Sequence, residues 1–219
     1  MSILPDAPEA ATRIVPDPEA RKTLAAYGEL LATAGVERGL IGPREVPRLW
    51  DRHLLNCAVA VDLVTGGAHV IDVGSGAGLP GVVWAILRPD VTVTCLEPLQ
   101  RRTVFLHEAV QALGLDGRVH VVRARAEDVV RGRGPVTSLR AGVVTARAVA
   151  ALDKLASWTV PLLEPGGVLL ALKGRSAQEE VEAARGTLSR LGVDEVDIVE
   201  CGIGDVDPPT TVVRAWRSA

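Results

Sequence analysis

The spacing of apolar positions changes near residue 65 of this 219-residue chain. Leucines at positions 24, 30 and 31 recur at intervals typical of an amphipathic helix and predict a helix over residues 19–34. A second helical pattern covers residues 44–64. Neither segment, nor the loop between them, has the pattern of a strand. We therefore expect an N-terminal helical extension over residues 19–64.

Beyond residue 65, short apolar runs alternate with helical segments. The apolar runs predict seven strands, over residues 69–74, 91–97, 118–124, 141–148, 167–174, 194–201 and 210–217. Helices are predicted from residue 80 onward and over residues 99–113, 151–163 and 176–191. This alternation is typical of a parallel sheet with helices on both faces. The last two runs have no helix between them, so we expect an antiparallel hairpin at one edge of the sheet.

The first 18 residues contain four prolines and are expected to form a disordered tail, followed by the extension and by a ligand-binding domain over residues 65–219. They show no basic stretch followed by an apolar segment, and no run approaches the roughly 18 apolar residues of a membrane span. Three cysteines far apart in the sequence argue against a disulfide framework and a zinc site. We expect a cytoplasmic protein without membrane contact, and nothing in the sequence demands more than a monomer.

A glycine-rich stretch, "HVIDVGSGAGLPG", covers residues 69–81 and combines a strand with four glycines. Residues 76–81 fit G-x-G-x-x-G, the dinucleotide fingerprint, which is weak alone. Asp72, Gly74, Gly76 and Gly78 fit the D-x-G-x-G-x-G pattern of enzymes that use S-adenosylmethionine (SAM). The strand runs directly into Gly74, and the closing hairpin suits a seven-stranded methyltransferase sheet, so SAM is favoured. An NAD-dependent oxidoreductase stays the alternative, which a comparison of SAM and NADH binding would separate.

Carboxylates lie at or just after the ends of the first three predicted strands. Asp72 is expected to orient the glycine loop or the ammonium of a bound zwitterion. Glu97 ends the second strand, where such folds place a carboxylate against ribose hydroxyls. Ala126 and Glu127 follow the third strand, where adenine is usually flanked in this fold. Together with the glycines, these residues predict a nucleoside site at one edge of the sheet.

Basic residues gather in the middle of an otherwise acidic chain. Residues 101–154 carry 10 basic and 5 acidic side chains, a local charge of +5, whereas the net charge of the chain is −3. A run of charge usually means no more than a solvated surface. These basic residues indicate a binding surface only if the substrate is a nucleic acid.

Five motifs resemble one family in order and spacing: "RHLLNC" (52–57), "DVGSGAGLPG" (72–81), "LEPLQRRTVFL" (96–106), "ARAVA" (146–150) and "LKG" (172–174). The resemblance is to bacterial small-subunit ribosomal RNA guanine-N7 methyltransferases, formerly called glucose-inhibited division protein B. It implies a Rossmann-like class I SAM-dependent α/β fold with a mostly parallel seven-stranded sheet and an antiparallel last strand. It also implies 16S rRNA of the 30S ribosomal subunit as the substrate. By resemblance, SAM contacts fall on Gly74, Leu79, Ala126, Glu127 and Arg147; the fold argument adds Asp72, Gly76, Gly78 and Glu97.

An RNA substrate gives the basic residues a function. Phosphate contacts are expected from Arg101, Arg102, Arg123, Arg125 and Lys173. His53 is expected either to contact RNA or to order the front helix against the SAM loop. Guanine N7 has a lone pair and no proton, so no general base is expected, and Arg147 is expected to help position the reactants. Methylation of another RNA or of a small molecule, and a non-catalytic SAM-binding assembly factor, stay as alternatives.

Overall fold

A twisted seven-stranded sheet forms the centre of the protein. The computed structural model describes residues 3–133, 136 and 138–219. The sheet order is β3-β2-β1-β4-β5-β7-β6, and every neighbouring pair is parallel except β5–β7 and β6–β7. The strands are β1 (His69–Val73), β2 (Thr92–Leu96), β3 (Val119–Val122), β4 (Ala141–Arg147), β5 (Leu163–Lys173), β6 (Val193–Cys201) and β7 (Thr210–Arg217). The predicted seven strands and the antiparallel hairpin are confirmed.

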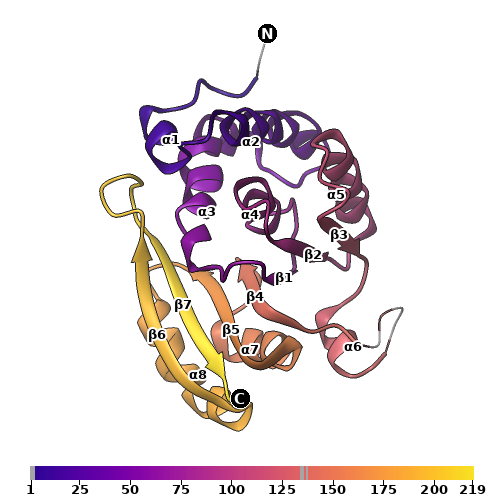
Figure 1. Ribbon diagram of the computed structural model, residues 1–219, viewed down its shortest axis with the longest axis vertical. Helices are drawn as coiled ribbons and strands as arrows, with labels where there is room; N and C mark the ends of the chain where they lie inside the picture. The colour runs from indigo at the N-terminus through magenta and orange to yellow at the C-terminus, as the bar shows by residue number, and fades with distance from the viewer. Residues whose placement is uncertain (1–2, 134–135, 137) are drawn as a thin grey trace.

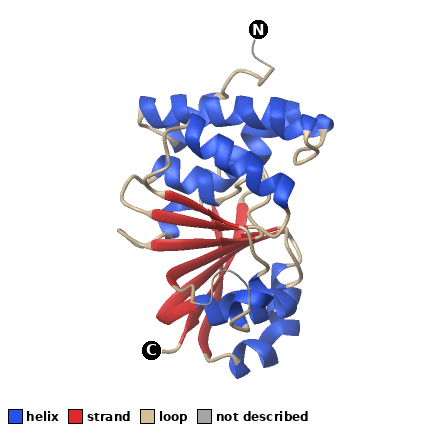
Figure 2. Cartoon of the chain, turned by 90° about the vertical axis from the view of Figure 1, so that its right-hand side faces the viewer, coloured by secondary structure: helices blue, strands red, loops and turns tan. Residues whose placement is uncertain are grey.

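Two layers of helices cover the two faces of this sheet, as Figure 2 shows. The apolar strand residues are divided accordingly: Val70 belongs to the core under the first layer, and its neighbour Ile71 to the core under the second. The first layer contains α1 (Glu9–Ile14), α2 (Pro18–Leu30), α3 (Asn56–Ala58), α4 (Gly81–Leu87) and α5 (Gln100–Ala112). The second contains α6 (Ala126–Val130), α7 (Leu152–Thr159) and α8 (Ala177–Arg190).

The expected disordered tail is instead packed against the N-terminal helices. α1 lies within it, and Leu4, Ala11 and Val15 are buried. The indole Nε1 of Trp50 donates a hydrogen bond to the carbonyl of Pro5 (2.9 Å). Prolines prevent a long helix here, but the apolar residues between them still bury their side chains. Figure 1 shows this segment crossing above α2 and α3.

The segment predicted as one helix over residues 44–64 changes helical type several times. A 3₁₀-helix (η2, Pro43–Arg48) leads into a π-helix (η3, Leu49–Leu55), and a second 3₁₀-turn (η4, Val61–Leu63) follows α3. Pro47 lies inside η2, where it removes a backbone donor. Wider π turns are frequent at functional sites. Two further short helices are the π-helix η1 (Leu31–Gly35), which continues α2, and the 3₁₀-helix η5 (Val160–Leu162), which follows α7.

One buried tyrosine joins the N-terminal helices to the loop after β1. Tyr27 of α2 is fully buried, and its hydroxyl donates to the carbonyl of Ala77 at 2.5 Å. Replacing it with phenylalanine leaves that buried carbonyl without its partner, which costs about 1–3 kcal/mol. We therefore expect Tyr27→Phe to lower the free energy of unfolding by this amount in urea titrations. An unchanged transition midpoint and slope would contradict the assigned bond.

Candidate functional site

The loop after β1 has a backbone conformation that glycine adopts without strain. Gly74, Gly76 and Gly78 have φ angles of 71°, 59° and 98°, all in the left-handed region. The amide of Gly76 donates to Oε2 of Glu97 at 3.0 Å, which ties the loop to the end of β2. The loop is thus held by its own conformation and by a carboxylate of the neighbouring strand.

The glycines of this loop differ in what surrounds them. A Cβ atom added to Gly76 would have only the carbonyl of Gly74 nearby, at 3.8 Å. A Cβ at Gly78 would lie 2.6 Å from Cγ2 of Val82 and 2.7 Å from the hydroxyl of Tyr27. Gly76 therefore leaves its outer side open to a ligand, whereas Gly78 allows close packing of the protein on itself.

Asp72 and Glu97 are buried carboxylates that organise the loop. Oδ2 of Asp72 accepts from the amide of Gly81 at the start of α4 (3.1 Å), and Oδ1 has no partner among the described residues. Burial raises the pKa of Asp72 to about 7. Glu97 also accepts from the amide of Leu99 (2.9 Å). Of the two expected roles of Asp72, the contacts support the orientation of the loop.

A cavity of about 220 Å³ opens beside this loop and unites several predicted cofactor residues. Gly74, Gly76, Leu79 and Arg147 line it. Asp72, Gly78 and Glu97 are not part of its wall, and neither are Ala126 and Glu127 at the start of α6. His53, Leu40 and Ile41 from the N-terminal region and Arg102 from α5 complete the wall.

Arg147, at the end of β4, connects the sheet to the N-terminal helices. Its guanidinium donates to the carbonyl of Arg52 (2.9 Å), to Sγ of Cys57 (3.0 Å) and to Nδ1 of His53 (3.2 Å). A guanidinium can only donate, so His53 is neutral, with its proton on Nε2 toward the carboxylate of Glu45 (3.0 Å). Burial lowers the pKa of His53, in agreement with this form. Of the two expected roles of His53, these contacts support ordering of the front helix.

A second and larger cavity, of about 1040 Å³, shares Arg147 and Ala148 with the first. Arg48, Arg52 and Arg175 also line it. Sequence reasoning missed these three as candidate RNA contacts because they lie outside the basic stretch of residues 101–154. Arg175 lies two residues after the end of β5, at the edge of a parallel sheet where ligands usually bind, and that position was a usable signal.

The predicted RNA contacts are divided between two environments. Arg101, Arg123 and Arg125 are exposed, near α5 and β3. Arg102 lies 3.6 Å from the carboxylate of Glu97. Lys173 differs from the expected surface contact: its side chain is only 8% exposed, and its ammonium is paired with Glu180. Arg102 lines the smaller cavity, and Arg123 contacts Gln100 at the start of α5, so we refer to Arg101, Arg102, Arg123 and Arg125 together as the basic surface. Lys173 lies apart from it, in the wall of the larger cavity described above.

The raised pKa of Asp72 predicts how stability depends on pH. The unfolded carboxyl ionises near pH 3.8 and the folded one near 7, so the folded state loses stability as pH rises through this window. Asp72→Asn removes this loss. We expect the stability advantage of the variant over the natural protein to be about 2–3 kcal/mol larger at pH 8 than at pH 5, measured by urea unfolding. A pH-independent difference would show that Asp72 ionises normally in the folded protein.

Comparison with known proteins places the chain in a family. A family model described as "GidB: rRNA small subunit methyltransferase G" matches residues 20–207. A protein of Thermobifida fusca named "Ribosomal RNA small subunit methyltransferase G" is 62% identical over 188 residues, covering 86% of this chain and 76% of that protein. A Streptomyces coelicolor protein with the same name is 56% identical over 211 residues, covering 96% and 85%.

Solved structures share the fold at low sequence identity. An O-methyltransferase from Bacillus cereus in complex with SAH superposes with a TM-score of 0.61 at 12% identity and covers 95% of each chain. A putative O-methyltransferase from Klebsiella pneumoniae gives a TM-score of 0.56 at 16% identity, covering 93% and 91%. Among the described residues, none of the helices is long and apolar enough to cross a membrane. The family model and the identity to its curated members show that this chain belongs to the rRNA small subunit methyltransferase G family.

Proposed function

We propose that this protein transfers the methyl group of SAM to N7 of a single guanine in the 16S rRNA of the small ribosomal subunit. Membership of the family makes the chain a SAM-dependent methyltransferase of small-subunit rRNA. We base the assignment of the site on one observation: two cavities meet at Arg147 and Ala148. One is built from the glycine loop and suits the cofactor; the other is lined by arginines and suits RNA.

The residues around the smaller cavity fit SAM. Gly76 offers an open backbone, and the helix α4 begins directly behind the loop. Glu97 places a buried carboxylate close to a cofactor that is itself cationic. When bound, SAM supplies a methyl group on a positively charged sulfur. We assign the cofactor to Gly74, Gly76, Leu79 and Arg147. Asp72 and Glu97 hold the loop through hydrogen bonds to backbone amides, and Gly78 allows it to pack closely against the protein.

Guanine N7 requires little of the protein chemically. Its lone pair attacks the sulfonium methyl without loss of a proton, so no side chain has to act as a general base. The protein must align nitrogen, carbon and sulfur and exclude water, and such alignment supplies on the order of 7–11 kcal/mol in favourable cases. Arg147 and Ala148, which face both cavities, stand where the two reactants would meet.

Basic side chains outnumber acidic ones in the wall of the larger cavity, which contains Arg48, Arg52, Arg147, Lys173 and Arg175 as well as Asp51, Glu180 and Asp207. Arg52 is paired with Glu45 (3.3 Å) and Lys173 with Glu180 (2.7 Å), whereas no ion pair of Arg48 or Arg175 is formed within the described part of the chain. Phosphates attract such guanidinium groups and position the RNA without reading its sequence. We assign the approach of the rRNA to this cavity and to the basic surface of Arg101, Arg102, Arg123 and Arg125.

A labelling experiment tests the proposed reaction. Purified protein is incubated with methyl-labelled SAM and with small subunits from cells that lack this gene. We expect label in one nucleoside, identified by mass spectrometry as 7-methylguanosine. Label in another nucleoside would contradict the N7 assignment. No transfer to small subunits or to their rRNA, by a protein that binds SAM, would contradict the proposed substrate.

Gly76 and Gly78 of the loop provide a matched test of the cofactor site. Both adopt positive φ, so alanine costs each a similar strain of about 1–2 kcal/mol. We expect Gly76→Ala to weaken SAM binding at least tenfold, because its Cβ enters the space beside the cofactor. Gly78→Ala should instead lower the melting temperature more, because its Cβ would overlap Val82. Calorimetric titration and thermal unfolding check both; natural SAM affinity in Gly76→Ala would refute the cofactor assignment.

Removing two arginines of the larger cavity tests the RNA assignment. We expect the double variant Arg48→Ala, Arg175→Ala to raise KM for small subunits about tenfold or more. The slope of log affinity against log salt concentration should fall by about one unit for each lost contact. The turnover number and SAM affinity should stay near their natural values. Lys22→Ala, which removes one charge from an exposed position of α2, is the control. An equal effect of the control would show a general charge effect and no RNA site.

A further inference from the structure

The segment that joins β4 to α7 forms a wall shared by the two cavities. Ala148 lines both of them and has a φ of 54°, a strained conformation for a residue with a Cβ. Val149 packs against the glycine loop so closely that a Cβ on Gly74 would lie 2.8 Å from its Cγ2. The conformation of residues 148–151 therefore determines how the cofactor side and the RNA side of the site face each other.

Lys173 holds the middle of this segment. It is the last residue of β5, the strand that pairs with β4 through Arg147 and Leu172. Its ammonium donates to the carbonyl of Ala150 (2.7 Å) and to Oε2 of Glu180 (2.7 Å). Lys173 and Glu180 lie in the wall of the larger cavity, but two of the three donors of Lys173 are used within the protein and its side chain is only 8% exposed.

Glu180 of α8 holds the end of the same segment. Its Oε2 accepts from the amide of Leu152, the first residue of α7 (2.8 Å), as well as from Lys173. Its Oε1 accepts from the hydroxyl of Ser176 (3.1 Å). Burial alone would raise the pKa of Glu180, but the hydrogen bonds from Lys173 and Leu152 outweigh it and the pKa is lowered. The pair is therefore ionic, and both partners bond to the backbone of the segment.

We propose that Lys173 and Glu180 are positioning residues for methyl transfer, which hold residues 148–152 in the one conformation that aligns the two cavities. A strained backbone persists only where its surroundings fix it, and these side chains fix the segment at Ala150 and at Leu152, directly after Ala148 and Val149. This role differs from the phosphate contact expected of Lys173 from its sequence position. It rests on the proposed function, since alignment has a purpose only if two substrates meet at Ala148.

Kinetics of Lys173→Met, Glu180→Gln and the double variant test this proposal on small subunits that lack the modification. We expect each single variant to lower kcat about 10–100-fold, the size of effect that a displacement near 1 Å produces, with KM for subunits changed less than about threefold. The double variant should be no worse than the poorer single variant, because both side chains hold the same segment. Lys173→Arg, which keeps the charge and the donors, should recover part of kcat.

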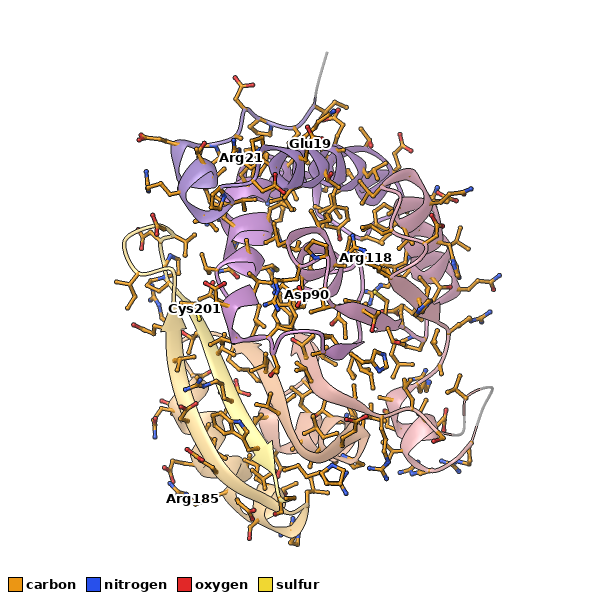
Figure 3. The ribbon with its side chains drawn as sticks, viewed as in Figure 1. Glu19, Arg21, Asp90, Arg118, Arg185 and Cys201 are labelled. Carbon is orange, nitrogen blue, oxygen red and sulfur yellow. The ribbon has the colours of Figure 1, made fainter. Side chains whose placement is uncertain are left out.

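A phosphate contact would give a different pattern. In that case Lys173→Met raises KM and flattens the salt dependence with kcat intact, and Glu180→Gln behaves as the natural protein; this result would overturn the proposal. Glu182→Gln and Arg185→Ala are matched controls, because this exposed ion pair lies on the same helix and Figure 3 shows Arg185 at the outer edge of the molecule. They should retain natural kinetics, and equal losses in them would also overturn it.

A readout independent of activity separates this proposal from the proposed function. Hydrogen exchange at the amide of Leu152 reports the bond to Glu180 directly, and we expect it to accelerate at least tenfold in Glu180→Gln and Lys173→Met but not in the controls. Faster exchange together with lower kcat supports the proposal. Unchanged exchange would overturn it even if activity fell. If the natural protein does not methylate small subunits, the proposed function is refuted. The exchange measurement would still test whether Lys173 and Glu180 hold residues 148–152.

Discussion

The site depends on the guanidinium of Arg147, which binds the end of β4 to the N-terminal helices. Its bonds to the carbonyl of Arg52, to His53 and to Cys57 join residues that lie 90 to 95 positions apart in the chain. Without this contact, the glycine-loop cavity would lose the side that η3 provides. The neutral state of His53 belongs to the same arrangement, because a protonated ring could not accept from an arginine. The N-terminal helices are thus part of the site and not an attachment to it.

Much of the fold could be predicted from the sequence because the strands are local patterns. Buried parallel strands are continuous apolar runs, and "HVIDVG" or "GVLLALKG" shows this without tertiary information. The helix at residues 99–113 was found within one residue at each end. The expected disorder was wrong for residues 3–18, because proline content describes the backbone and not the apolar side chains that Leu4 and Val15 bury. The π-helix η3 has no local signal that distinguishes it from an α-helix.

The site was predictable to the extent that the backbone itself builds it. Gly74, Gly76 and Leu79 follow a strand directly, so their place beside a ligand cavity could be inferred. The direction of a side chain could not. Lys173 ends a strand in the way a ligand contact would, yet it is turned toward Glu180, which lies seven residues further on α8. Arg48 and Arg52 reach the larger cavity only because the helices fold back over β4, a contact that no local pattern shows.

We propose that the cofactor and the acceptor occupy two cavities that meet at Arg147 and Ala148. The decisive measurement is a crystal structure of the protein with S-adenosylhomocysteine. We expect the amino-acid portion of this product against Gly74 and Gly76, with its sulfur facing Ala148 and the arginine-lined cavity. A sulfur that faces away from Ala148, or a ligand bound among Arg48, Arg52 and Arg175, would refute this arrangement.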